Sequence, residues 1–301
     1  AMFPKNESPD GFAGKYIPVP LEYGNPQGRA HVFANAQNQQ TASDVVSYFV
    51  YAVQDYQLVT ITNLLMEQTK SNAGAFVDEA SRTLDNGFRN LSNNMAFELF
   101  FGGTASRGQV SAAGVTGSTT LTFVLANAQN VVQFEVGMSL QGSATDGGAV
   151  IANSGDVVAQ VTSVNRGSGV ITATVVQGTY SSSWPIGTYL QVYGDIGTAG
   201  ATTIAGLLGL SGLAAWVPAT DPTSSDNFWG VNRSADPTSL GGLRYDASAQ
   251  TISEGLTNAL GYANREGAAI DLIVIDFVSY TTLINELGAK VQYVQLEHDE
   301  V

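Results

Sequence analysis

The pattern of hydrophobic and polar positions predicts one long amphipathic helix, from Ser71 to about Phe101. Its apolar residues recur every three or four positions, which places them on one helical face: Phe76, Ala80, Leu84, Phe88, Leu91, Met95 and Leu99. Gly102 and Gly103 then supply a stop. Such a helix would be roughly 45 Å long, whereas a compact chain of this length has a radius of gyration of roughly 19 Å. The pattern therefore favours a subunit built to meet neighbours.

The first forty residues read as arm and loop around a two-stranded flap. Val19–Leu21 and Arg29–Phe33 alternate as strands, and the turn residues 24–28 lie between them. A flap of two strands is marginal by itself, so it is expected to need a partner surface. Further along the chain, Ser47–Val59 is β-branched and aromatic and reads as another strand, and Thr60–Lys70 reads as a helix.

Residues 116–195 change character, because only about five of them carry charge and short β-rich runs alternate with glycine-rich turns. The predicted strands are Thr119–Leu125, Val131–Leu140, Val157–Val164, Val170–Val176 and Tyr189–Tyr193. A hairpin over Val157–Val176 is the clearest local prediction. Five short strands of this kind indicate a small closed barrel or sandwich inserted into a host domain.

The C-terminal third predicts a different architecture. Ser248–Arg265 reads as a helix, Ile270–Ile275 as an apolar strand buried on both faces, and Ser279–Leu287 as a second helix. Together they form an expected α–β–α layer. The uncharged stretch Ile196–Thr220 has too few large apolar residues for a membrane span, so a buried or interface segment is favoured. The resulting domain boundaries are 1–46, 47–115, 116–195, 196–247 and 248–301.

Composition narrows the class of protein. Only 13% of the 301 residues are charged, about half the usual quarter. The net charge of −14 argues against a basic nucleic-acid-binding face, although it allows an acidic wall around enclosed DNA. The chain has no cysteine, which removes disulfides, thiolate metal sites and cysteine nucleophiles.

Residues for catalysis are sparse. The two histidines, His31 and His298, lie far apart in the sequence, and neither has a second histidine at a metal-binding spacing. Asp271 and Asp276 flank the predicted strand and suggest a hydrolase, but Asp276 is better explained as a helix cap. No GxSxG, Walker A or dinucleotide motif is present. We therefore expect no enzyme activity, no catalytic or metal site and no cofactor.

Several segments together resemble the major capsid proteins of tailed phages that have the HK97 fold. YGNPQGRAHVFANAQ (Tyr23–Gln37) is similar to an E-loop tip, and DYQLVTITNLLMEQTKSNAGAF (Asp55–Phe76) to the lead-in of a spine helix. VVQFEVGMSLQGSATDGGAV (Val131–Val150) is similar to a β-insert of one subset. FWGVNRSADPTSLGGLRYD (Phe228–Asp246) and AIDLIVIDFVSYTTLINELGAKVQYV (Ala269–Val294) resemble the passage into and through the A-domain.

The resemblance implies an α+β, HK97-like capsid fold: an N-terminal arm and E-loop, a P-domain with its spine helix, an inserted β-domain and an A-domain. It implies a virion protein, assembled in the host cytoplasm, that forms hexamers and pentamers of an icosahedral shell. The shell would enclose double-stranded DNA without reading its sequence. Decoration or cement, scaffold and portal proteins are the implied partners, and no membrane is involved.

This sequence departs from the family pattern in three ways, and each leads to an expectation. Relatives usually extend beyond both ends of this stretch, so the 301 residues are expected to cover part of a longer protein. Residues 23–37 contain Arg29 and no lysine, so covalent crosslinking of the E-loop is replaced by non-covalent clamping or a cement protein. The β-insert is expected at the outer surface or between capsomers.

The candidate assembly residues follow from the flap and the long helix. On the flap they are Tyr23, Asn25, Gln27, Arg29 and Phe33. On the polar face of the helix they are Asp78, Arg82, Asp85 and Arg89, and Arg244 completes the set. Ordinary solvated ion pairs, worth about 0.2–0.5 kcal/mol each, are the alternative for the helix charges.

Two alternative functions stay open. One is an encapsulin-like nanocompartment shell, which would enclose enzymes instead of DNA. The other is a β-barrel surface module that binds glycans through Trp184 and Tyr180.

Overall fold

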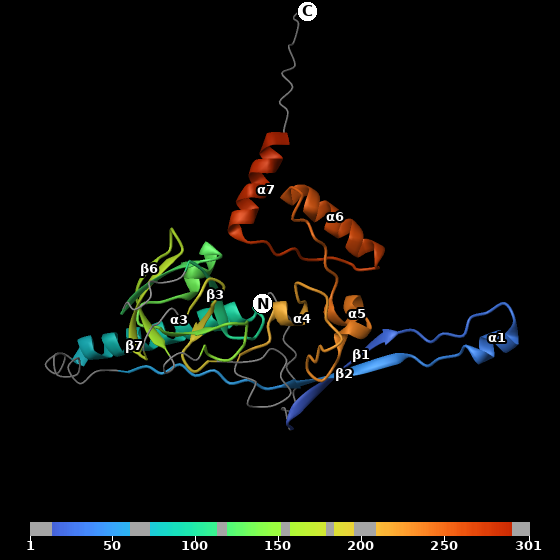
Figure 1. The fold of residues 1–301 in the computed structure, drawn as a ribbon, viewed down its shortest axis with the longest axis horizontal. Helices are drawn as coiled ribbons and strands as arrows, with labels where there is room; N and C mark the ends of the chain where they lie inside the picture. Colours follow the sequence, from blue (N-terminus) through green and yellow to red (C-terminus); the bar gives the residue numbers. More distant parts are fainter. Residues whose placement is uncertain are drawn as a thin grey trace, which may run out of the picture. The chain divides into compact units, whose positions relative to one another are not determined.

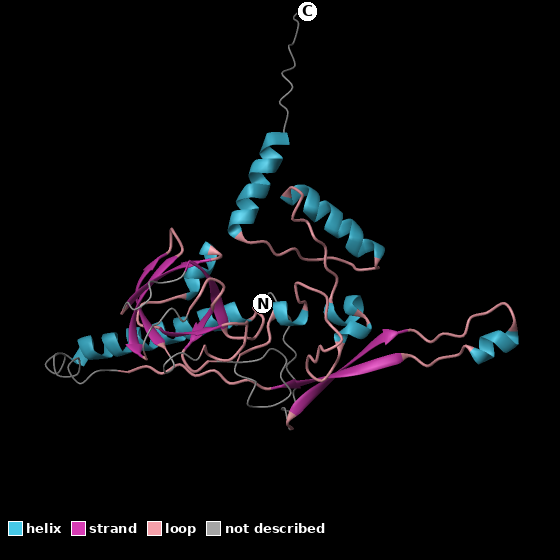
Figure 2. Ribbon diagram, in the orientation of Figure 1, coloured by secondary structure: helices cyan, strands magenta, loops and turns pink. Residues whose placement is uncertain are grey.

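The computed structural model describes residues 14–60, 73–112, 119–151, 157–178, 184–195 and 209–290. The chain divides into an N-terminal unit, which ends at Gly241, and a C-terminal unit, which begins at Gly242. Figure 1 shows the course of the chain, and Figure 2 shows where its helices and strands lie.

Six strands of the N-terminal unit close into an antiparallel barrel with the order β3-β4-β7-β6-β5-β8. The strands are β3 (Ser106–Ala112), β4 (Thr120–Leu125), β5 (Ser139–Ser143), β6 (Val158–Asn165), β7 (Val170–Gln177) and β8 (Tyr189–Val192). Closure pairs β8 with β3, so the sheet keeps no free edge. The short 3₁₀ helix η1 (Ala128–Gln133) lies between β4 and β5.

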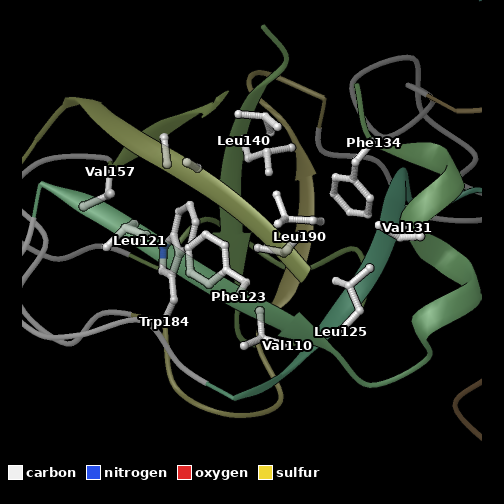
Figure 3. Packing of buried hydrophobic residues seen from close by; sticks show 14 residues of the cluster. Val110, Leu121, Phe123, Leu125, Val131, Phe134, Leu140, Val157, Trp184 and Leu190 are labelled. Carbon is white, nitrogen blue, oxygen red and sulfur yellow. The ribbon is translucent and has the colours of Figure 1, made fainter. Parts of the chain in front are cut away.

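The barrel interior holds the larger hydrophobic core. On β4, buried and exposed residues alternate, so Leu121, Phe123 and Leu125 point inward while the residues between them face outward. Phe123 packs against Trp184 with ring centroids 5.3 Å apart, and neither side chain is exposed. Figure 3 shows these side chains filling the interior. A β-branched, charge-poor sequence thus buries its apolar residues within its own barrel.

A separate two-stranded ribbon precedes the barrel in the chain. It consists of β1 (Tyr16–Gly24) and β2 (Asp44–Tyr51), paired antiparallel, with helix α1 (Phe33–Asn38) in the connection between them. Figure 1 shows α1 at the tip of this connection, away from the two strands. The register shifts between Glu22 and Gly24, where the ribbon opens into the connecting loop.

Helix α3 (Ala73–Glu98) joins the ribbon to the barrel in the sequence. After the barrel come α4 (Leu213–Trp216), the 3₁₀ helix η3 (Arg233–Ala235) and α5 (Pro237–Gly241). The C-terminal unit contains α6 (Ile252–Arg265) and α7 (Phe277–Lys290), which pack against each other. Backbone N–H groups of Ile252 and Ser253, at the start of α6, donate to the Glu286 carboxylate of α7.

The HK97-like fold predicted from the sequence is wrong for this chain. The structure is β-rich, and its main core belongs to the antiparallel barrel. Helix α3 has 26 residues, but none of the described strands or helices packs extensively along it. Its apolar residues Leu84, Phe88 and Met95 are 48%, 69% and 50% exposed, so it is no spine through a layered domain. The hydrophobic burial that such a fold requires lies in the barrel instead.

The predicted α–β–α layer of the C-terminal unit is also absent from the described residues. Its two helices form, but Ile270–Ile275 adopts no regular secondary structure, because no described strand pairs with it. Most of this run is exposed, where a strand buried on both faces was predicted.

Other predictions have mixed outcomes. The hairpin over Val157–Val176 is confirmed as β6–β7. The predicted strand Arg29–Phe33 is wrong, because the ribbon's second strand is β2 and α1 begins at Phe33. The predicted strand Val131–Leu140 is wrong over most of its length, because η1 occupies its start. The predicted helix Thr60–Lys70 lies outside the described residues except for Thr60, which has no regular structure.

Candidate assembly surface

The ribbon is anchored at the end of β2 by a second hydrophobic cluster. Its buried residues are Tyr48, Ala215, Phe228, Trp229, Val231 and Leu240. The Tyr48 hydroxyl donates to the Leu240 carbonyl at 3.0 Å, and the Phe49 N–H donates to the Trp229 carbonyl at 3.0 Å. Burial raises the pKa of Tyr48, so the hydroxyl stays protonated as a donor. These contacts fix one end of the ribbon to the residues around Trp216 and Leu240.

A buried ion pair locks this cluster. The Arg233 guanidinium binds both carboxylate oxygens of Asp226, at 2.9 and 3.0 Å, and donates to the carbonyl of Ala215 at 2.7 Å. It also lies 4.2 Å from the ring centre of Phe228. The hydrogen bonds from Arg233 lower the pKa of Asp226. A bidentate pair with further acceptors meets the condition under which a buried charge is tolerated.

Away from the anchor, the ribbon exposes apolar side chains on both faces. Opposed residues of an antiparallel pair share a face, so Val19 and Tyr48 mark one face and Pro18 and Phe49 the other. The exposed apolar residues are Tyr16 at 42%, Ile17 at 49%, Val19 at 43%, Leu21 at 37%, Val45 at 58% and Phe49 at 37%. Two strands that leave this much apolar surface in water need a covering partner.

The connection at the ribbon's end is held by its own hydrogen bonds. Gln27 and Thr41 bond twice: the Gln27 N–H donates to the Thr41 hydroxyl, and the Thr41 N–H donates to the Gln27 carbonyl, both at 3.0 Å. The Gln27 amide also donates to the Asn25 carbonyl. Phe33 is 82% exposed on α1, and Arg29 lies in the lining of a shallow pocket of about 590 Å³ beside it. A cation and an aromatic ring are thus presented together to solvent.

The other candidate residues belong to other elements. Asp78 belongs to α3, but its side chain lies outside the described residues. Arg82, Asp85 and Arg89 are exposed on α3, and in the described part of the chain no ion pair joins Asp85 to Arg89. Arg244 is half-buried at the start of the C-terminal unit. The ribbon and its connection thus hold the flap candidates, and Tyr23 among them is half-buried next to β2.

A polar cleft of about 1060 Å³ lies between α3, the barrel and residues 54–60. Burial raises the pKa of Glu98 and of Asp195, and burial lowers the pKa of Arg107, a residue of β3. Arg107 donates to Asn94 Oδ1 at 3.0 Å and to the Gln133 carbonyl at 3.2 Å. Arg107 therefore links α3 to the barrel through its hydrogen bonds, and its charge offsets that of the nearby carboxyl groups of Glu98 and Asp195.

Most of the residues that the sequence offered as catalytic or ligand-binding candidates either have a structural role or lie outside the described residues. Asp276 caps α7: its Oδ1 accepts from the N–H groups of Val278 and Ser279 at 2.9 and 3.0 Å, and its pKa is lowered by these bonds. Trp184 is fully buried in the barrel, so it is not available to stack on a sugar. His298 and Tyr180 fall outside the described residues. Within those residues no three His, Asp or Glu side chains gather to hold a metal ion, and no helix is long and apolar enough to cross a membrane.

Sequence reasoning missed the Arg233–Asp226 pair of the anchor. Tyr48 and Arg233 are far apart in the chain, and only the fold brings them to one cluster. A signal was present in the aromatic pair Phe228-Trp229, followed four residues later by Arg233 in a charge-poor stretch. A lone arginine beside aromatic residues is typical of a buried, hydrogen-bonded cation.

Comparisons with family models, with curated proteins and with solved structures found no match to this chain. The class that the geometry defines is therefore a β-rich protein with a closed barrel and an anchored apolar ribbon. Its function has to be argued from the ribbon's surface.

Proposed function

We propose that this chain is a structural subunit that assembles with copies of itself into hexamers and pentamers of an icosahedral shell around double-stranded DNA, the role of a major capsid protein. The HK97-like fold is no part of this proposal. One observation carries it: an anchored two-stranded ribbon exposes apolar residues on both faces. Such surface is rare on proteins that stay monomeric and is typical of interaction sites.

Further features support assembly. The described part of α3 adds exposed apolar residues, Leu84, Phe88 and Met95, on the face that its periodicity predicts. The net charge of −14 suits a wall that surrounds nucleic acid without adhering to it. Residues 23–37 lie at the ribbon's end, with Arg29 and Phe33 exposed.

The test is electron microscopy of purified protein, with particle yield as the readout. Wild-type protein should form closed particles of uniform diameter, and particles isolated from a phage-producing host should contain DNA. Arg29→Glu should lower the particle yield at least tenfold, because it places a negative charge at a contact between net negative subunits.

Arg166→Glu is the matched control. It makes the same change of charge on the barrel surface, where Arg166 forms an exposed pair with Glu135 and a long hydrogen bond of 3.5 Å to the Phe134 carbonyl. This variant should assemble like wild type. Particles filled with an enzyme and no DNA would instead indicate a nanocompartment. A wild-type protein that stays monomeric at every concentration would refute the proposal.

A further inference from the structure

The two edges of the β1–β2 ribbon differ. The Phe49 N–H points away from β1, because it donates to the Trp229 carbonyl at 3.0 Å. Phe49 is opposed by Pro18, so this pair is non-hydrogen-bonded, and alternation gives the same status to the pair of Pro20 with Ser47. The N–H and C=O groups of Val45 and Ser47 therefore point outward along the free edge of β2.

The opposite edge is closed to another strand. By the same alternation, the outward positions of β1 include Pro18 and Pro20, which have no N–H to donate. Prolines at such positions protect an edge from pairing. A strand can therefore join this ribbon only beside β2.

A groove of about 430 Å³ runs beside the open edge of β2. Its lining residues are Tyr23, Val46, Ser47, Phe49, Gly230, Val231, Asn232 and Ala235. An extended chain placed there would find backbone partners on β2 and apolar surface from Val46 and Phe49. This combination is typical of β-augmentation, in which main-chain bonds give affinity and alternate side chains give specificity.

The chain also carries a segment suited to this groove. In Ile270–Ile275, the side chains of Ile270, Leu272 and Val274 fall on one face if the segment is extended, and they are 41%, 58% and 52% exposed. No N–H or C=O of this run bonds to another described residue. Ile275, on the other face, lines a pocket with residues of α6. The run is therefore tethered at one end and leaves its apolar face uncovered.

We propose that the open edge of β2 accepts the run Ile270–Ile275 of a second copy of this chain as an added third strand. The inference rests on the proposed self-assembly and names its contact. Each copy offers one acceptor edge and one donor run. Such a head-to-tail contact closes into a ring when the rotation between copies allows it, as capsomers require.

Disulfide trapping tests the contact, because the chain contains no cysteine. Ser47→Cys protein is mixed with Leu272→Cys, Ile273→Cys or Val274→Cys protein and oxidised. Adjacent strands bring Cβ atoms to about 4.5–5.5 Å, close enough for a disulfide after a small shift. At least one mixture should give a crosslinked heterodimer. Glu22→Cys, on the outward positions of β1, is the control and should give none.

A second variant tests the edge itself. Ser47→Pro removes an outward N–H and leaves the Val19–Tyr48 and Leu21–Val46 pairs intact, so circular dichroism should be unchanged. It should lower crosslinking of a Val45→Cys acceptor, on the same free edge, at least tenfold. Particles that form normally without any crosslink would overturn this inference and leave the proposed function standing. A disulfide formed within one molecule of a Ser47→Cys/Leu272→Cys double variant would also overturn it. Absence of particles would refute the proposed function instead.

Discussion

Replacing Arg233 by methionine should destabilise the ribbon's anchor. Methionine fills a similar volume but makes none of the hydrogen bonds to Asp226 and to the carbonyl of Ala215. The Arg233 side chain is 6% exposed and that of Asp226 is 16% exposed, so the variant leaves a carboxylate in a largely dry site. Breaking a buried pair costs about 3–5 kcal/mol. Because Asp226 keeps some contact with water, we expect about 3 kcal/mol.

Urea unfolding followed by tryptophan fluorescence measures this loss, since Trp216 and Trp229 lie in the anchor cluster. Two controls separate charge from geometry. Arg233→Lys keeps the charge without the bidentate fork and should give an intermediate loss. The double variant Arg233→Met/Asp226→Leu should be more stable than Arg233→Met alone, because no unpaired charge remains. A loss below about 1 kcal/mol for Arg233→Met would refute the reasoning.

The same pair sets a pH dependence. The pKa of Asp226 is lowered from its ordinary value of 3.8. A lowered pKa contributes stability above the ordinary value, and this contribution is lost as the pH falls through the folded-state pKa. Wild-type protein should therefore lose stability of the anchor below about pH 4. Arg233→Met should show a smaller loss over this range, because its Asp226 lacks the cation that lowers the pKa.

Two further substitutions test the packing. Tyr48→Phe leaves the buried Leu240 carbonyl without its donor and should cost about 1–3 kcal/mol in urea unfolding; an unchanged midpoint would contradict the anchor. Gly169→Ala should destabilise the barrel by more than about 1 kcal/mol, because Gly169 has φ +69° and an added Cβ would lie 2.7 Å from the Cα of Ala128; a melting temperature equal to that of wild type would contradict the close approach.

The sequence predicted those elements whose signal is local. Strands β6 and β7 are rich in β-branched residues, and their turn carries Asn165, whose side chain accepts from the N–H groups of Gly167 and Ser168. Helices α3 and α6 follow their 3.6-residue periodicity. In these cases each residue's neighbours in the chain are enough to determine its conformation.

Elements that depend on distant partners were missed. Strand β3 has one large apolar residue, Val110, and exists because β4 and β8 pair with it on either side. Residues 131–133 were read as the start of a strand, but they belong to η1, which begins where Asn127 accepts from the Gln129 N–H. The order of segments that suggested an HK97-like fold indicates which secondary-structure elements occur. It does not determine how these elements pack, which depends on which apolar faces contact each other. In this structure the barrel strands bury their apolar faces inside the barrel, and α3 leaves Phe88 of its apolar face exposed.

The candidate surface was predictable in part. The flap's need for a partner followed from its having only two strands, although its second strand was placed wrongly at Arg29–Phe33, and the structure adds exposed apolar residues on both faces. Which edge of the ribbon can accept another strand was not predictable. The outward position of Pro18 on β1 is known only once its pairing with Phe49 is known.

The central claim is that the ribbon is stabilised by copies of the same chain. Hydrogen–deuterium exchange at the amides of Val19, Leu21 and Val46, measured alongside sedimentation over a dilution series, tests it most directly. These residues belong to the hydrogen-bonded pairs of β1 and β2. We predict that their protection falls at least tenfold when large assemblies dissociate into single subunits. Full protection in a protein that sediments as a single subunit at every concentration would contradict the account.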